Sequence, residues 1–198
     1  MNSNEVRRTY RWIAPLYDSL FRRLYEGLRS DSIRALNLHP SETVVLVGVG
    51  TGLDIPLLPK GSTAVGIDMT PEMLRRAAGR NRGGAAFLLG DGAALPIADG
   101  CVSAVIFHLV LSVAPDPVAL LAEAARILPP GGRVAVLDHF APAGRVSWPR
   151  RVLGRLPAAL GTHMDRHFED FRTDANFRIV SDRRMVRGLY RALILERL

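Results

Sequence analysis

The chain has 198 residues, of which 48% are hydrophobic and 23% are charged, with a net charge of +7 at neutral pH. This length predicts one domain around one hydrophobic core, and the scattered Gly and Pro residues exclude a fibrous or largely disordered protein. All but one of the 26 basic residues are arginine, which favours anionic partners, although an arginine-rich genome would produce the same excess.

The single cysteine and the N-terminus bear on the cellular location. Cys101 cannot form an internal disulfide, and the N-terminus lacks an apolar stretch followed by a small-residue cleavage site. We therefore expect a cytoplasmic protein, with Cys101 as a small buried side chain within its apolar run. No uninterrupted apolar segment reaches the roughly 18 residues that a membrane-spanning helix needs, so any membrane association would be peripheral, on the inner face.

Residues 1–40 are predicted to form a bent, basic helical lid. Hydrophobic residues recur at steps of three and four from Val6 to Leu28, and Pro15 interrupts this helical pattern. Six arginines and three acidic residues lie between positions 5 and 29, so the segment is both amphipathic and positively charged.

From position 41 the hydrophobic pattern alternates between strands and helices. Nearly continuous, β-branched runs predict strands at 43–49, 64–67, 85–89, 102–107 and 133–137. Helical patterns span 71–81, with Thr70 as the N-cap, and 116–128, ending before Pro129. This alternation predicts a Rossmann-like α/β core over residues 41–140, with a doubly wound, mostly parallel sheet and right-handed crossovers.

The C-terminal region departs from this alternation. Residues 177–181 and 189–195 are predicted to be two strands joined by a basic turn at 182–188. An antiparallel hairpin over residues 177–198 would complete a seven-stranded sheet. The intervening residues 141–176 are predicted to be an insert on the substrate side of a single domain.

The strongest local motif is the glycine-rich turn Gly48-Val49-Gly50-Thr51-Gly52, at the end of the first predicted strand. Glycines at this place let the backbone approach a ligand at the carboxyl edge of a sheet. A dinucleotide-binding loop would require glycine at position 53, where this chain has Leu53, so the spacing weighs against NAD. A purely structural turn would also explain three glycines.

Two aspartates at the ends of the next strands make the motif more specific. Asp68 ends the second predicted strand, where a carboxylate can accept hydrogen bonds from both hydroxyls of a ribose. Asp91 follows the third strand and is placed to accept a hydrogen bond from an adenine amino group. Three loops at the ends of three consecutive strands therefore converge on one nucleoside.

These segments resemble the class I S-adenosylmethionine-dependent methyltransferases over nearly the full chain. The matching segments are VLVGVGTGLD, GIDMTPEML, GDGAALPIADG, VIFHLVLSVAPDP and EAARILPPGGRVAVLDHF. Within that superfamily the chain is most similar to the small bacterial phosphatidylethanolamine N-methyltransferases and their quinone-methylating relatives, on the segments YRWIAPLYD, HLVLS and GLYRALIL. The resemblance implies S-adenosyl-L-methionine as cofactor and S-adenosyl-L-homocysteine as product.

The resemblance also implies positions for the cofactor. Gly48, Gly50 and Gly52 would line its methionine end, and Asp68 would hold its ribose. The adenine would meet a second group of residues: Met69, Asp91, Gly92 and Ala93. Tyr10 and Tyr17 would fold over the site from the lid, and His108 would lie beside the sulfonium.

One position departs from the family pattern. Family members usually carry an acidic residue two places before the first glycine, where it helps to anchor the amino group of the cofactor, and this chain has Leu46 there. The departure would weaken cofactor binding, transfer the role to Asp54 or a water molecule, or mark a protein that binds the cofactor without catalysis.

Methyl transfer from a sulfonium needs alignment more than acid or base catalysis, but an ammonium acceptor must first lose a proton. Tyr17 and His108 are the candidates for positioning or deprotonation, with packing of Tyr10 and Tyr17 on the apolar stripe and a buried, hydrogen-bonded His108 as the structural alternatives. His139 follows the fifth strand and is a candidate to touch the substrate. His163 and His167 are one helical turn apart, but no third ligand is evident, so we expect no metal site.

The basic segments favour a lipid acceptor. Residues 141–164 contain four arginines, Trp148 and several leucines but no acidic residue, which is typical of an interfacial helix on anionic lipid, although an ordinary solvated helix has the same pattern. No nucleic-acid-binding module is recognisable. The leading hypothesis is N-methylation of phosphatidylethanolamine. The alternatives are methylation of a quinone precursor or other small molecule and a non-catalytic cofactor-binding protein, and the oligomeric state is left open.

Overall fold

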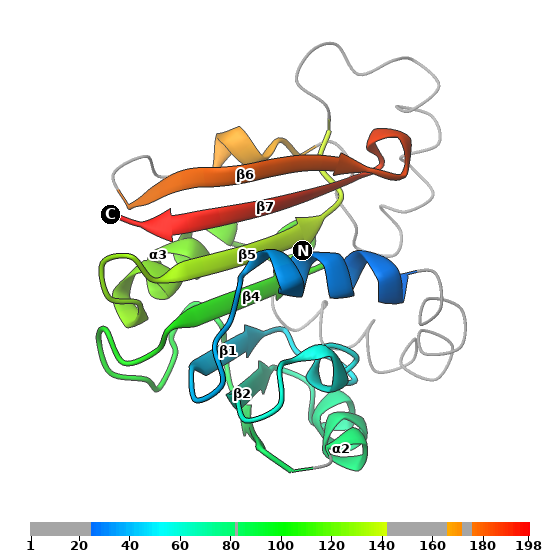
Figure 1. Ribbon diagram of the computed structural model, residues 1–198, viewed down its shortest axis with the longest axis vertical. Helices are drawn as coiled ribbons and strands as arrows, with labels where there is room; N and C mark the ends of the chain where they lie inside the picture. The colour runs from blue at the N-terminus through cyan, green and yellow to red at the C-terminus, as the bar shows by residue number, and fades with distance from the viewer. Residues whose placement is uncertain (1–24, 82, 142–165, 172–175) are drawn as a thin grey trace.

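The computed structural model describes residues 25–81, 83–141, 166–171 and 176–198. Within these residues a seven-stranded sheet has the order β3-β2-β1-β4-β5-β7-β6 (Figure 1). The strands are β1 (Thr43–Val47), β2 (Thr63–Asp68), β3 (Ala85–Leu89), β4 (Ala104–His108), β5 (Arg133–Asp138), β6 (Phe177–Met185) and β7 (Tyr190–Arg197). Strands β1 to β5 pair in parallel, and β7 pairs antiparallel with both β5 and β6. The predicted Rossmann-like sheet with a closing antiparallel hairpin is confirmed.

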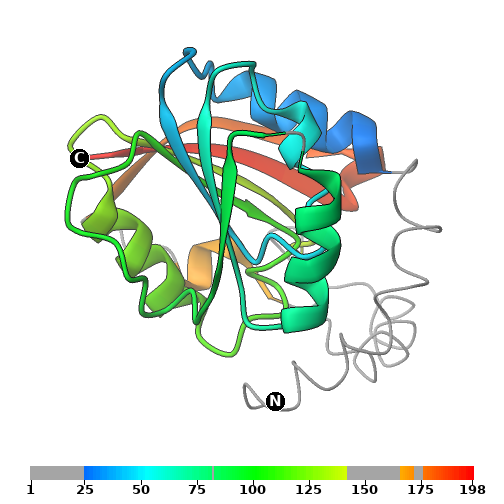
Figure 2. The same ribbon diagram turned by 90° about the horizontal axis from the view of Figure 1, so that it is seen from below.

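Helices cover both faces of the sheet (Figure 2). A helix at residues 25–35 and α2 (Pro71–Arg80) lie on one face, and α3 (Pro117–Ile127) lies on the other. Helix α3 begins where Asp116 accepts a hydrogen bond from the backbone N–H of Ala119 at 2.9 Å, which satisfies one N-terminal donor. Thr70 is the N-cap of α2, as predicted, but its side chain makes no capping hydrogen bond.

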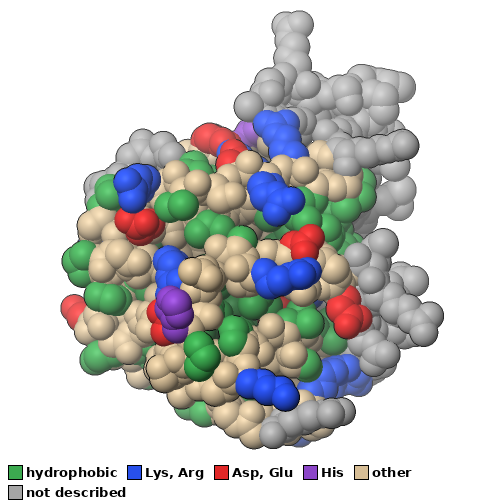
Figure 3. Space-filling view, viewed as in Figure 1, with side chains coloured by type: hydrophobic (Ala, Val, Ile, Leu, Met, Phe, Trp, Pro, Cys, Tyr) green, Lys and Arg blue, Asp and Glu red, His purple; other side chains and the backbone are tan. Residues whose placement is uncertain are grey.

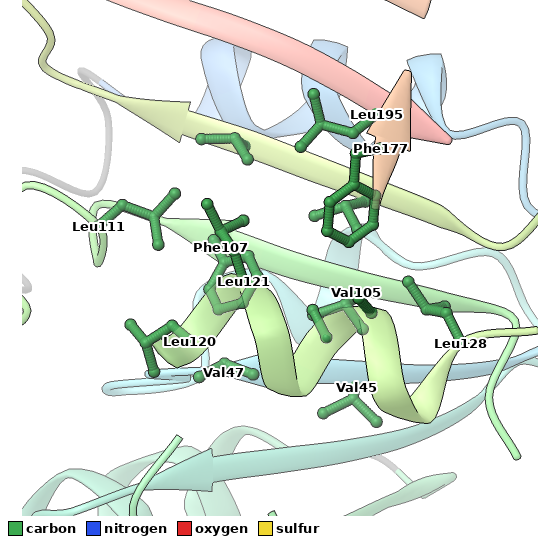
Figure 4. Packing of buried hydrophobic residues seen from close by; sticks show 14 of the residues in the cluster. Val45, Val47, Val105, Phe107, Leu111, Leu120, Leu121, Leu128, Phe177 and Leu195 are labelled. Carbon is green, nitrogen blue, oxygen red and sulfur yellow. The ribbon is translucent and has the colours of Figure 1, made fainter. Parts of the chain in front are cut away.

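Alternation along the central strands separates two hydrophobic layers. On one face, Val45 and Val47 of β1 pack with Phe107 of β4 against Leu120 and Leu121 of α3 (Figure 4). On the other face, the intervening residues Leu46 and Ile106 pack against Ile33 of the helix at 25–35 and Leu36, which directly follows that helix. Both central strands are therefore buried on both faces, which explains their nearly continuous apolar sequences.

Two expectations about exposure and strand length were wrong. Cys101 is exposed, because β4 begins only at Ala104 and the residues before it form a surface connection. Strand β6 continues to Met185, so most of the predicted basic turn lies within the strand and only Val186–Gly188 form the turn. Arginines are tolerated there because β6 is an edge strand, and Asp182 accepts hydrogen bonds from Arg191 of β7.

The predicted lid and insert are described only in part. Residues 25–36 of the predicted lid form a helix and its end, and they contribute buried side chains to the core. Residues 1–24, and residues 142–165 and 172–175 of the predicted insert, lie outside the described residues. Among the helices that the structure describes, none has the length and apolar character needed to cross a membrane.

Candidate functional site

A pocket of about 220 Å³ lies at the carboxyl ends of β1, β2 and β4, where open α/β sheets bind ligands. Its polar wall includes Asp68, Asp91, Asp116, Thr51, Arg29 and His108. Its apolar wall includes Val49, Ile67, Met73, Val110, Val113 and Leu120. A mostly apolar cavity with a few convergent polar groups is typical of a small-molecule site.

Asp68 connects the glycine-rich turn to the end of β2. Its carboxylate accepts hydrogen bonds from the backbone N–H groups of Gly50 and Thr70, each at 2.9 Å. Burial raises the pKa of Asp68, although these two hydrogen bonds oppose the shift. Each carboxylate oxygen can accept more than one hydrogen bond, so Asp68 can hold the turn and still bind ligand hydroxyls.

Gly50 and Gly52 of the turn require the absence of a side chain for different physical reasons. Gly50 has a φ of +56° and faces open space, since a Cβ there would lie 3.9 Å from the carbonyl oxygen of Gly48 and closer to no other part of the fold. Gly52 is not among the pocket-lining residues, and a Cβ there would lie 2.9 Å from the Cα of Ala77 in α2. Gly50 therefore leaves room for a ligand, whereas Gly52 lets α2 pack closely against the turn.

The residues expected around an adenine also line the pocket. They are Met69, Asp91, Gly92 and Ala93, and Gly48 joins them from the first turn. Asp91 accepts a hydrogen bond from the backbone N–H of Ala93 at 2.9 Å and is exposed, so its other oxygen is accessible. A Cβ at Gly92 would lie 2.5 Å from Val47, so the absence of a side chain lets this loop approach β1.

A buried polar cluster that was not predicted from the sequence lies at one wall of the pocket. Asp54 pairs with Arg29 at 2.8 Å and with Nδ1 of His108 at 2.9 Å. Nε2 of His108 lies 3.0 Å from the hydroxyl of Ser32. All four residues are buried, and Arg29 and His108 line the pocket.

The electrostatics of this cluster favour one charge arrangement. Burial alone would raise the pKa of Asp54, but His108 and Arg29 outweigh it and hold the pKa well below its usual range. Asp54 is therefore ionised at neutral pH and balances the Arg29 guanidinium. Both ring nitrogens of His108 are occupied within the cluster, which matches the alternative of a hydrogen-bonded structural histidine and leaves no ring nitrogen open to an acceptor.

The cluster bears directly on the unusual Leu46. That side chain is 1% exposed and packs in the core against Ile33 and Leu36, so it offers no polar contact to a ligand. Both oxygens of Asp54 are engaged by Arg29 and His108, so Asp54 anchors Arg29 rather than facing the pocket itself. The cationic group at this wall is therefore Arg29.

The spacing of residues along the helix at 25–35 could have indicated part of this cluster from the sequence. Arg29 and Ser32 lie three residues apart, and Ile33 is four residues after Arg29, which places all three on one helical face. An arginine on a buried face needs an acidic partner, but the spacing could not identify Asp54, which lies 25 residues along the chain.

His139, the residue expected to touch the substrate, directly follows β5 and is not among the residues that line the pocket. Its ring packs against that of Tyr190, with centroids 4.0 Å apart and the ring planes tilted by 50°. The Tyr190 hydroxyl donates a hydrogen bond to the hydroxyl of Tyr25. The neighbouring Asp138 is fully buried and accepts hydrogen bonds from the backbone N–H groups of Ser112 and His139. The predicted Tyr10, Tyr17 and His163 lie outside the described residues.

Comparisons with known proteins identify the family. A model described as a methyltransferase domain matches residues 45–136. A phosphatidylethanolamine N-methyltransferase from Cereibacter sphaeroides is 30% identical over 200 residues, and the match covers 95% of this chain and 95% of that protein. The chain belongs to the class I S-adenosylmethionine-dependent methyltransferases.

Two further comparisons define the extent of the likeness. A demethylmenaquinone methyltransferase from Corynebacterium kroppenstedtii is 34% identical over 143 residues, and the match covers 70% of the present chain and 61% of the Corynebacterium protein. A Haloferax volcanii methyltransferase, solved in complex with a methyltransferase activator, has the same fold, with a TM-score of 0.80 at 21% identity over 96% of this chain and 97% of that one. The predicted family, enzyme class and cofactor, S-adenosyl-L-methionine, are confirmed.

Proposed function

We propose that this methyltransferase N-methylates phosphatidylethanolamine at a membrane surface. The observation that carries the proposal is the match to a phosphatidylethanolamine N-methyltransferase, which covers 95% of both chains. The match to the demethylmenaquinone methyltransferase covers 70% of this chain and 61% of that protein, so it accounts for less of either sequence. Methylation of a quinone precursor is the second candidate, favoured by several relatives of that name.

In this proposal different pocket residues bind different parts of the cofactor. Gly48 and Gly50 border the methionine part, and the Arg29 guanidinium pairs with its carboxylate, since a planar fork of donors suits a carboxylate. Asp68 accepts the ribose hydroxyls. Met69 packs on the adenine face, and the loop that begins at Asp91 contacts the adenine edge.

When bound, S-adenosylmethionine supplies a methyl group already activated on a sulfonium. The protein then has to exclude water and align the acceptor amine with that methyl group, for which a mostly apolar wall is suitable. A primary ammonium must lose its proton before it can attack. His108 has both ring nitrogens engaged, so in this proposal it positions Asp54, and the ammonium proton goes to water. Tyr17 is then a candidate to position the amine.

His139 is proposed to contact the acceptor. Its side chain is 21% exposed, and its ring lies against Tyr190 at the end of β5, on the same sheet edge as the pocket. An imidazole there can donate a hydrogen bond to a lipid phosphate or a quinone oxygen. Replacement of His139 by Gln is therefore expected to raise the KM for the acceptor while leaving the Kd for the cofactor unchanged.

The proposal is tested by methyl transfer from labelled S-adenosylmethionine. The purified full chain is incubated in parallel with phosphatidylethanolamine in mixed micelles and with a demethylated quinol, and the D68N variant serves as a control for cofactor-dependent labelling. Labelled lipid supports the proposal. Labelled quinol without labelled lipid refutes it in favour of the second candidate.

A further inference from the structure

The β6–β7 hairpin has an exposed tip in which basic and apolar side chains lie together. Val186 is 48% exposed and Leu189 is 43% exposed, and both belong to the turn region between the two strands. Arg183 and Arg184, at the end of β6, are also exposed. We call these four residues the hairpin tip. Large exposed apolar side chains beside basic residues are typical of a surface that binds a membrane or another protein.

The local charge around the tip is positive. Residues 182–191 contain four arginines and one acidic residue, Asp182. Asp182 is paired with Arg191 at 2.8 Å, and Glu169 pairs with the same guanidinium at 2.7 Å. The carboxylates of Asp182 and Glu169 are thus held by Arg191. Arg183 and Arg184 are both exposed, on opposite faces of the sheet, and Arg183 borders a small pocket with Asp31, which pairs with Arg34. The described part of the face in Figure 3 has basic, acidic and hydrophobic side chains interspersed, which favours a local contact over a broad basic surface.

The tip lies at the same edge of the sheet as the cofactor pocket. Asp138, the last residue of β5, is paired with Arg191 of β7, which in turn is paired with Arg184 of β6. The turn therefore extends past the carboxyl end of β5, as Figure 1 shows. Strand β7 is separated from β4 by β5 alone, so the start of β7 lies about 10 Å from the end of β4 at the usual strand spacing.

The backbone of the tip is strained at Val186. This residue has a φ of +49°, a left-handed conformation that β-branched side chains rarely adopt. Gly188, two residues later, has a φ of +81° without such a penalty. The base of the hairpin is held by Tyr190, which contacts His139 and Tyr25. The fold therefore presents an apolar side chain at a strained position on a firmly packed base, and strain of this kind is often found at functional sites.

We infer that the hairpin tip of Arg183, Arg184, Val186 and Leu189 docks the enzyme on an anionic membrane surface. Val186 and Leu189 enter the boundary between headgroups and acyl chains, and the two arginines pair with lipid phosphates. This contact places the pocket edge of the sheet next to the headgroups. The inference rests on the proposed phospholipid acceptor for its purpose, but its physical basis is the exposure and charge of the tip.

Vesicle co-sedimentation of the full chain tests the inference. The vesicles contain either phosphatidylcholine alone or equal parts of phosphatidylcholine and phosphatidylglycerol. The V186D/L189D variant is expected to bind the anionic vesicles at least about tenfold more weakly, because two apolar side chains no longer leave water. R183Q/R184Q is expected to lose about fivefold per arginine, on the anionic vesicles only.

A control variant is available on the same strand. Val180 is 56% exposed at an irregularity in the β6–β7 pairing and lies six residues before Val186, so V180D adds a charge to the same edge strand at about 20 Å from Val186. V180D is expected to bind vesicles like the wild type.

Aspartate adopts a positive φ more readily than valine, so V186D is expected to fold, which an unchanged Kd for S-adenosylmethionine verifies.

The outcomes separate this inference from the proposed acceptor. Equal vesicle binding by V186D/L189D and the wild type, or no binding by the wild type, overturns the inference even if phosphatidylethanolamine in mixed micelles is methylated. Weakened vesicle binding by V186D/L189D but not by V180D supports it even if the labelled acceptor is a quinol. In that case the tip docks an enzyme whose acceptor is another membrane-dissolved molecule.

Discussion

Replacement of Asp54 by Asn is the sharpest test of the buried cluster. The Asp54 and Arg29 side chains are 5% and 7% exposed and lie 2.8 Å apart. At this separation Coulomb's law gives an attraction of roughly 6 kcal/mol at an effective dielectric constant of 20, before the cost of desolvation is subtracted. Removing one partner leaves the other as a buried, uncompensated charge, which typically costs about 3–5 kcal/mol.

The expected loss is large relative to the total stability of about 5–15 kcal/mol for a protein domain. Urea unfolding followed by circular dichroism at pH 7 measures the free energy of unfolding of the wild type, D54N, R29M and R29M/D54N. The double variant is expected to lose less than the sum of the single losses, because it leaves neither charge buried alone. A loss below about 1 kcal/mol in D54N would refute the assignment of Asp54 as the counter-ion of Arg29.

The same carboxylate predicts a direction of pH dependence. The folded pKa of Asp54 lies below the unfolded value of about 3.9, so its contribution to stability is present above that value and is lost as the pH falls further below it. The wild type is therefore expected to lose stability more steeply than D54N when the pH is lowered below about 4. Parallel stability curves for the two proteins over that range would contradict the pKa shift.

The remaining predictions concern the pocket. D68N is expected to weaken S-adenosylmethionine binding at least about tenfold by calorimetry. Because burial raises the pKa of Asp68, the affinity of the wild type should begin to fall at a pH above about 3.9 on acidification, whereas that of D68N should not change. An equal dependence of affinity on pH in both proteins would contradict this role of Asp68. G52A is expected to lower the free energy of unfolding by about 1–3 kcal/mol, because its Cβ meets Ala77 at a φ of +78°, whereas G50A should cost less stability but hinder cofactor binding; equal effects on unfolding would argue against these roles. L46E places a carboxylate in the core and is expected to destabilise the protein by several kcal/mol, whereas undiminished stability with tighter cofactor binding would show that an acid can still serve at this position.

The amino-acid sequence by itself determined the elements and the general place of the site. The strand predicted at 133–137 is β5, Arg133–Asp138, because local hydrophobic patterning reports which residues are buried, and all but the first residue of this strand are buried. Asp68 and Asp91 could be placed at one edge of the sheet, because the carboxyl ends of parallel strands meet there. These inferences need only the order of the elements and the rule that neighbouring parallel strands share a direction.

Only the tertiary structure decided which polar groups meet and which side chains reach the surface. Arg29 and Asp54 are 25 residues apart, and His108 is a further 54 residues along, so no local spacing relates them. The exposure of Cys101 and the extension of β6 through its arginines likewise depend on where a connection and an edge strand lie in the sheet. Hydrophobic periodicity records burial within one element, whereas the partner of a buried charge is set by the packing of several elements around it.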